Sequence, residues 1–353
     1  MASPQRRRRL RRSDCSEPGL HRRRRGRGFT YTREDGRPVT DREVLGRLRE
    51  LAVPPAWQDV WICPDPQGHL QATGIDAAGR KQYLYHPLWR EHRDRLKFAR
   101  MARFGKRLPK LRRDTASDLR GEELSHPRVL ACAVRLLDVG MFRVGSEQYA
   151  EDDGGIGLAT IRKEHVSLRN GEAIFDYPAK GGQRRAQVIH DPPCVAVVAA
   201  LKRSRNSCPE LLAYRNGRRW HGLRSDEINE YLKERLGPEF SAKDFRTWNA
   251  TVLAAVSLAT DGRDSRSKTS RKRATDSAVR AVAELLGNTP AVARRSYIDP
   301  RVFDRYLSGW TIAPALERLP SLDPSDDRIR ARIERAVLDL LADRSSSPAL
   351  ERT

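Results

Sequence analysis

Short strand-like runs separated by turn residues occupy residues 56–89. The runs DVWIC, HLQATGI and KQYLYH alternate with the turn sequences PDPQG and DAAGR. Aromatic and β-branched residues favour strands, whereas Gly, Pro and Asp favour tight turns. Because turns this short join antiparallel neighbours, the sequence predicts an antiparallel meander. With a short helix over residues 40–52, which Thr40 or Asp41 can cap, the meander predicts a small β-rich domain at residues 29–95.

Helical periodicity dominates the rest of the chain. Apolar residues recur at helical spacing in the long, basic segment 88–114, again after residue 116, and in a last helix marked by Ile329, Ile333, Val337 and Leu340. A second meander interrupts this pattern, where the turns RNGE and KGGQ join EHVSL, AIFDYPA and RRAQVIHD. The fold class is therefore α+β: a small N-terminal antiparallel β-rich domain, then a larger, mainly α-helical domain (residues 96–312) with a small β meander. Residues 313–353 are predicted to be a C-terminal helical extension, and residues 261–277 a polar, basic linker.

The chain is strongly basic. Its 68 Lys and Arg exceed its 46 Asp and Glu, which leaves a formal net charge of +22. Such a balance attracts polyanions, and nucleic acid is the commonest polyanionic partner. Residues 1–28 carry eleven arginines but only Asp14 and Glu17 as acidic residues. We therefore expect these residues to be a disordered tail, which either tethers DNA non-specifically or is merely solvated.

Several classes of site and location are excluded by missing patterns. No apolar run is long enough to span a membrane, so we expect a cytoplasmic protein without a membrane partner. The five cysteines are scattered and never paired as CxxC, and neither a GxxxxGK[ST] loop nor HExxH occurs. The acidic fragment EDDGGIG, residues 151–157, could imitate a magnesium site, but Asp-Gly runs are more often turns. We expect no cofactor and no metal, with a magnesium nuclease as an alternative.

Phosphate chemistry without a metal remains open to this chain. It needs a nucleophile, a proton donor for the leaving alkoxide, and cations around the non-bridging oxygens. Local context selects five candidates: Tyr297 behind two arginines, Arg143 and Arg246 among apolar residues, Lys180 at a glycine-rich hairpin tip, and Asn288 in a turn between two helices. Each also has an ordinary structural explanation, as a packed tyrosine, an ion-pair partner, a turn residue or a helix cap.

Five ordered motifs carry a family resemblance. MFRVGSEQY, DYPAKGG, KDFRTWN and LGNTPAVARRSYIDP resemble segments of the small type IB DNA topoisomerases of bacteria and poxviruses, and residues 54–89 resemble their N-terminal DNA clamp. The resemblance covers residues from about 40 to about 312. It implies an enzyme that relaxes both signs of supercoil without ATP or metal. In this reaction Tyr297 would form a 3′-phosphotyrosyl link, Arg143 and Arg246 would hold the non-bridging oxygens, and Lys180 would protonate the departing 5′-oxygen.

The resemblance also implies roles outside this central set. Where many relatives have histidine, this chain has Asn288, which can donate a hydrogen bond but cannot exchange a proton near neutral pH. Oxyanion stabilisation alone is therefore implied for Asn288. The partner would be double-stranded DNA, enclosed by a monomeric clamp. The implied contacts of the N-terminal domain with DNA are Arg80, Gln82, Tyr83 and Tyr85.

Two other functions stay open. A tyrosine recombinase uses similar phosphotyrosyl chemistry, but usually shows HxxR where this chain has the segment from Lys243 to Arg246. A non-catalytic basic DNA-binding protein would explain the net charge, but not arginines placed among apolar residues. A plasmid relaxation assay separates the three, because a recombinase needs paired sites and a binder relaxes nothing.

Overall fold

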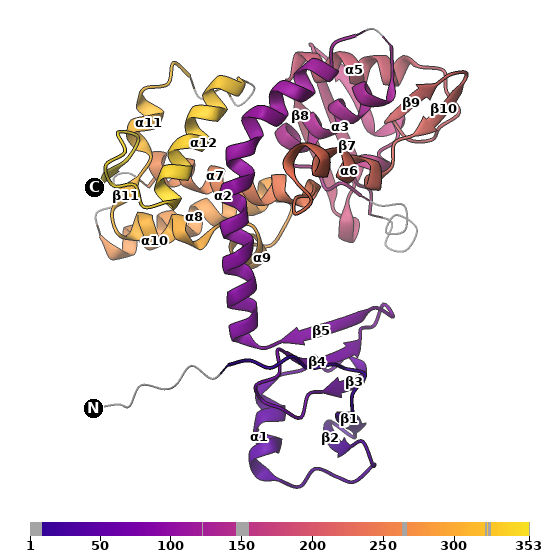
Figure 1. Cartoon of the computed structure of the whole chain (residues 1–353), viewed down its shortest axis with the longest axis vertical. Coiled ribbons are helices and arrows are strands. Elements are labelled where there is room, and N and C mark those ends of the chain that lie inside the picture. Colours follow the sequence, from indigo (N-terminus) through magenta and orange to yellow (C-terminus); the bar gives the residue numbers. More distant parts are fainter. Residues whose placement is uncertain are drawn as a thin grey trace. The chain divides into compact units, whose positions relative to one another are not determined.

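The computed structural model describes residues 9–121, 123–145, 155–262, 267–321, 323 and 326–352. The chain divides into two compact units, residues 1–98 and 99–353. Helix α2 (Pro87–Asp118) begins in the first unit and continues into the second (Figure 1). Among the described helices, none has both the length and the apolar character needed to cross a bilayer.

The first unit is a five-stranded antiparallel sheet with the strand order β2-β1-β3-β4-β5. The predicted meander is confirmed as its last three strands. The predicted helix is also confirmed as α1 (Arg42–Glu50), and the side chain of Asp41 caps it by accepting from the backbone N–H groups of Glu43 and Val44. The strands are β1 (Leu20–Arg25), β2 (Gly28–Arg33), β3 (Gln58–Ile62), β4 (Leu70–Ile75) and β5 (Lys81–Tyr85).

Helix α1 covers one face of this sheet. Leu48 of α1 packs in one cluster with inward-facing sheet residues, among them Val60 and Ile62. A second, smaller cluster contains Trp61, Cys63 and Leu70. Because side chains alternate between the two faces of a strand, Trp61 lies on the opposite face from Val60 and Ile62. The sheet therefore has one face covered by α1 and one face turned away from it.

The expectation of a disordered tail over residues 1–28 is wrong where the structure describes it. Strand β1 lies inside this segment and pairs with both β2 and β3. Arg22 is only 9% exposed, and its guanidinium donates to the carbonyl oxygens of Val53, Pro54 and Trp57 at 2.6, 2.8 and 2.9 Å. Hydrogen bonds to carbonyls compensate the burial of this charge, so the arginine run can enter a sheet. Residues 1–8 lie outside the described residues.

The second unit is mainly helical. Its first helix after α2 is α3 (His126–Gly140), and the predicted second meander is confirmed as a sheet of order β6-β7-β8. The strands of that sheet are β6 (Val166–Arg169), β7 (Glu172–Pro178) and β8 (Arg184–Ile189). The later helices are α5 (Pro192–Arg203), α6 (Ser225–Leu236), α7 (Ala242–Thr260), α8 (Lys268–Leu286), α9 (Pro290–Ser296), α10 (Pro300–Leu307), α11 (Ala313–Glu317) and α12 (Asp327–Leu341).

These findings confirm the α+β class and correct two details. Two small two-stranded sheets add to the predicted sheet: β9 (Ala213–Asn216) with β10 (Arg219–Gly222), and β11 (Trp310–Thr311) with β12 (Glu351–Arg352). The predicted linker over residues 261–277 is wrong from Lys268 onward, because α8 begins there behind the cap residue Ser267. Residues 263–266 lie outside the described part.

A buried ionic network fastens the last long helix to the body of the second unit. Arg112 of α2 donates to Asp138 of α3 at 2.8 Å and to Glu334 of α12 at 2.7 Å. Glu334 also accepts from the indole Nε1 of Trp248 on α7 at 3.1 Å. Burial alone would raise the pKa of Asp138, but the charges of Arg112 and Arg330 hold it well below its usual range. The network connects α12 to α7, the helix that carries Arg246.

Candidate functional site

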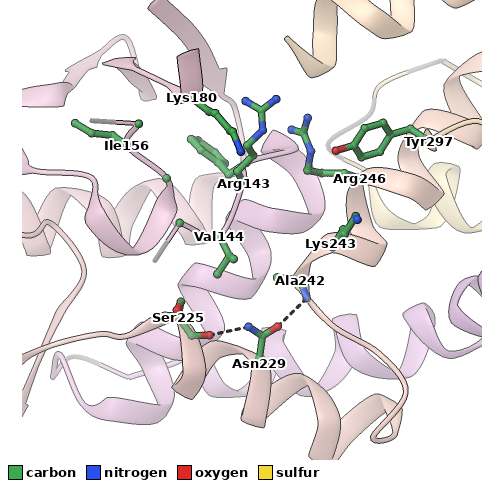
Figure 2. Close-up of a pocket in the computed structure, with 14 residues that line it drawn as sticks. Arg143, Val144, Ile156, Lys180, Ser225, Asn229, Ala242, Lys243, Arg246 and Tyr297 are labelled. Carbon is green, nitrogen blue, oxygen red and sulfur yellow. Dashed lines mark hydrogen bonds between the residues drawn. The ribbon is translucent and has the colours of Figure 1, made fainter. Parts of the chain in front are cut away.

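Four of the five predicted catalytic candidates line one cavity in the second unit. The cavity has a volume of about 430 Å³, and its walls include Arg143, Lys180, Arg246 and Tyr297. These residues come from the loop after α3, the turn between β7 and β8, helix α7 and the end of α9. Figure 2 shows their side chains converging, with the hydroxyl of Tyr297 facing the guanidinium of Arg246.

Tyr297 is held at the end of a short helix. Thr289 caps the start of α9 through its side chain, and Pro290 fits the first turn, where no N–H bond is lost. Tyr297 closes the helix as its C-cap residue. Its carbonyl oxygen accepts from the hydroxyl of Thr251 on α7 at 3.3 Å. The tyrosine backbone is thereby tied to the same helix that carries Arg246.

Arg246 is the most buried cation of the cavity. It is 4% exposed, and its guanidinium donates to the carbonyl oxygens of Leu286, at 2.7 Å, and of Met141. Its guanidinium carbon lies 5.4 Å from the centre of the Tyr297 ring. Burial, followed by repulsion from Arg143, lowers the pKa of Arg246 to about 10. Within the described residues, its Nε atom is buried and has no hydrogen-bond partner.

The C-terminal end of α8 organises three arginines. Arg185 of β8 donates to the carbonyls of Glu284 and Leu285 at 2.9 and 2.5 Å, and Arg246 donates to the next carbonyl along the chain. Arg143 donates to the carbonyl of Gly287 at 3.2 Å. The last carbonyls of a helix lack partners within the helix and carry partial negative charge, so they attract cations. Arg185 was missed by the sequence analysis, because its partners are about a hundred residues away.

Asn288 lies directly behind this helix end. Asn288 is not among the residues that line the cavity. Its Oδ1 nevertheless accepts a 3.0 Å hydrogen bond from Arg143, which does line the cavity. Because a guanidinium can only donate, this contact fixes which end of the amide faces Arg143. The Nδ2 group is consequently turned elsewhere, and it is buried without a partner among the described residues.

Nearby cations change the acidity of Tyr297. Burial of the phenol would raise its pKa, but the positive charges of Arg246, Lys243 and Arg143 outweigh burial and lower the pKa below its ordinary value. A lower pKa puts more of the side chain in the nucleophilic phenolate form. Lys243, which also lines the cavity, was not among the predicted site residues. Its spacing of three from Arg246 puts both on one face of α7, and that spacing is the signal that could have found it.

Lys180 lies in the tight turn between β7 and β8. Gly181 and Gly182 follow it with φ angles of 78° and 72°, which glycine adopts without strain. The backbone of Gly155 also packs closely against this turn, since a Cβ atom there would lie 2.7 Å from the Cα atom of Lys180. Residues 151–154 of the acidic fragment lie outside the described residues. Among the residues that are described, no group of three or more His, Cys, Asp or Glu could hold a metal ion.

The four predicted DNA contacts lie in β5 and the turn before it, in the first unit, but alternation along the strand puts Gln82 on the opposite face from Tyr83 and Tyr85. Asp76 binds two of them: Arg80 donates through Nε at 3.2 Å, and Gln82 through Nε2 at 2.9 Å. Tyr83 is 45% exposed and stacks on Tyr85, with ring centres 6.2 Å apart. The side chain of Tyr85 packs partly against Trp61, Cys63 and Leu70.

Comparison with known proteins gives matches in both units. Residues 86–308 match the model of the catalytic core of eukaryotic DNA topoisomerase I, and residues 28–76 match the model of the N-terminal domain of bacterial DNA topoisomerase IB. The chain is 28% identical to the DNA topoisomerase 1B of Acanthamoeba polyphaga mimivirus, over 79% of this chain and 85% of the viral protein. It is 20% identical to the DNA topoisomerase 1B of vaccinia virus (strain Copenhagen), over 77% and 88% of the two chains.

Proposed function

Because this chain belongs to the type IB DNA topoisomerase family, we propose that it relaxes positive and negative supercoils of duplex DNA by nicking and resealing one strand through Tyr297, without ATP or metal. The observation that carries this proposal is a phenol beside Arg143, Lys180, Lys243 and Arg246 in one cavity. Cleavage by a tyrosine needs such positive charge, because the transition state concentrates negative charge on the phosphate oxygens.

In the cleavage step two residues take part in bond changes: Tyr297 as the nucleophile and Lys180 as the proton donor. The Tyr297 phenolate attacks phosphorus and forms the 3′-phosphotyrosyl bond, while the bond from phosphorus to the 5′-oxygen breaks. Lys180 gives a proton to that oxygen, which departs as a hydroxyl. The lowered pKa of Tyr297 supports the first half of this step, because less free energy is needed to form the phenolate.

Arg143, Arg246 and Asn288 would bind the non-bridging oxygens. The Nε of Arg246 and the Nδ2 of Asn288, which have no partner among the described residues, support these roles, because a buried donor without an acceptor is costly unless a ligand supplies one. Asn288 would act only as a hydrogen-bond donor, since a side-chain amide does not titrate near neutral pH.

Resealing reverses the same chemistry. The covalent bond keeps the energy of the broken phosphodiester, so the free 5′-hydroxyl can attack it after the duplex has rotated. The proton returns to Lys180, and Tyr297 leaves as phenolate. No external energy source is required in this cycle.

We further propose that Arg80, Gln82, Tyr83 and Tyr85 contact DNA and that one copy of the chain encloses the duplex. The exposure of Tyr83 and its stacking on Tyr85 support a surface on which DNA can lie. Size measurement of the protein bound to a short duplex tests the stoichiometry, and two copies per duplex would contradict the monomeric clamp.

Relaxation of a supercoiled plasmid tests the main proposal. Purified protein in EDTA, without ATP, is expected to relax both positively and negatively supercoiled plasmid. A denaturing gel should also show protein joined to 3′ ends. Relaxation that requires two copies of a specific site would instead favour a recombinase, and binding without relaxation would favour a non-catalytic DNA-binding protein.

A further inference from the structure

The register of the N-terminal sheet puts two arginines of β1 on the same face as Tyr83. Directly paired residues in neighbouring strands share a face, and His21 pairs with Trp61, Trp61 with Thr73, and Thr73 with Tyr83. Side chains along a strand alternate, so Arg23 and Arg25 lie on the same side as His21. The face that bears Tyr83 therefore also bears Arg23 and Arg25 on β1, and residues 15–19 pack over Trp61 between these two exposed parts.

Arg22 and Arg24 lie on the other face. Leu20 pairs with Ile62 and belongs to the cluster covered by α1, so alternate residues of β1 turn toward the α1 side. Arg22 is buried there and bound to three backbone carbonyls. Arg24 is exposed beyond it, beside Phe29 on the paired strand. Four consecutive arginines thus divide into two pairs with different surroundings.

Arg23 and Arg25 are exposed and bind no carboxylate of the described chain. The hairpin that carries them turns at Gly26, with φ 57°, and Arg27, so further positive charge lies at its tip. Like charges held side by side repel one another, and an external polyanion relieves this repulsion. The sheet presents cations at two places on one face: Lys81 on the edge strand β5, and these two arginines on β1, which is next to the other edge strand, β2.

We propose that Arg23 and Arg25 bind phosphates of the duplex, so that the DNA-binding face of the N-terminal unit extends from β5 to β1. This inference rests on the proposed function. Three strand spacings separate β5 from β1, about 14 Å at roughly 4.8 Å each. The major groove of B-DNA is about 12 Å wide, so Lys81 and the two arginines of β1 can contact the two phosphate backbones that border one groove.

The salt dependence of binding tests the proposal. Each phosphate contact contributes about −0.9 to the slope of log affinity against log salt concentration. The double variant Arg23→Ala/Arg25→Ala is therefore expected to flatten the slope by about 1.8 for a duplex of fixed length. Arg24→Ala is the matched control, because it removes an exposed arginine of the same strand from the opposite face, and its slope should stay near that of the wild-type protein. Arg23→Lys/Arg25→Lys should retain the original slope.

Two outcomes are decisive. If the double alanine variant, folded as judged by its thermal transition, keeps the wild-type slope, or if Arg24→Ala flattens the slope as much per charge removed, the proposal is overturned. Its failure differs from a failure of the proposed function, because the wild-type protein would still relax plasmid in EDTA. A wild-type protein that binds DNA without relaxing it would instead overturn the proposed topoisomerase function. The salt slopes of the variants would then still decide whether Arg23 and Arg25 bind phosphates.

Discussion

The Oδ1 atom of Asn288 accepts a 3.0 Å hydrogen bond from Arg143, and this contact leaves Nδ2 of the same amide buried with no partner in the described part of the chain. One residue thus orients a guanidinium and keeps a donor of its own available. If a phosphate oxygen takes that donor, the amide would act both as a ligand of the phosphate and as a support for Arg143. This double role gives Asn288 a stronger expected effect on cleavage than a simple helix-flanking residue would have.

Asn288→Ala is expected to slow single-turnover cleavage by about 10²- to 10³-fold, the usual effect of removing one oxyanion donor. Asn288→Asp should be slower still, because a carboxylate would pair with Arg143 and repel the phosphate. Rates measured on a short duplex that traps the covalent complex check both variants. Cleavage by Asn288→Ala at the wild-type rate would show that Nδ2 does not contact the phosphate.

Tyr297→Phe should abolish relaxation while DNA affinity stays near that of the wild-type protein. The substitution removes only the phenolic oxygen, and no other hydroxyl is proposed to attack phosphorus. Plasmid relaxation and duplex binding, measured on the same preparation, check the two halves of this prediction. Relaxation that persists in this variant would assign the nucleophile to another residue.

Lys180→Ala should slow cleavage of ordinary DNA by about 10²- to 10⁴-fold, the range typical of general acid catalysis. A substrate with sulfur in place of the 5′-bridging oxygen should restore the rate, since a thiolate leaves without a proton. The wild-type protein on the same substrate provides the control. If the sulfur substrate gave Lys180→Ala no advantage, the lysine would act by charge or position rather than as a proton donor.

The pH profile of cleavage should depend on Lys243. The positive charge of Lys243 is one of the causes that lower the pKa of Tyr297, so phenolate is populated at lower pH than for an ordinary tyrosine. Lys243→Gln removes that charge and should shift the rise of the cleavage rate to higher pH. Single-turnover rates measured across the alkaline range give the midpoint. A midpoint that stays in place or moves to lower pH would mean that Lys243 does not influence the phenol.

Glu334→Ala should destabilise the second unit by about 3–5 kcal/mol, because removing one partner of a buried ion pair leaves an uncompensated charge. Arg112 would lose one of its carboxylates, and the indole of Trp248 its acceptor. Asp114→Ala, which breaks the exposed pair with Lys110, is the control and should cost below about 1 kcal/mol. Urea unfolding monitored by tryptophan fluorescence measures both. If both variants lost the same amount of unfolding free energy, the buried network would have no special role in stability.

Local patterns were sufficient to predict much of the site. Lys180 stands before two glycines at a hairpin tip, and Arg246 lies among apolar residues of a helix, so their sequence neighbours already indicate an enclosed turn or a buried cation. The fold class followed from the spacing of strand runs and helical faces. In each of these cases the signal lies in residues close together in the chain, although the carbonyls that hold Arg246 belong to the distant residues Met141 and Leu286.

Features that depend on distant partners were not predictable in this way. Arg22 resembles its arginine neighbours in sequence, and only the carbonyls of residues 53–57 make its burial possible. The first turns of α8 are polar and basic, so they read as a linker, although their C-terminal continuation from Thr275 packs into the core. Arg185 could not be found either, because its role depends on where α8 ends in space.

The carbonyl oxygens at the end of α8 hold three arginines before any substrate arrives. These long side chains therefore lose their conformational entropy when the protein folds, and DNA binding does not have to order them. The same arrangement makes the positions of all three arginines depend on one helix end. A change that moved the last turn of this one helix would misdirect all the guanidiniums together, so an inactive variant could arise with every cation of the cavity still present.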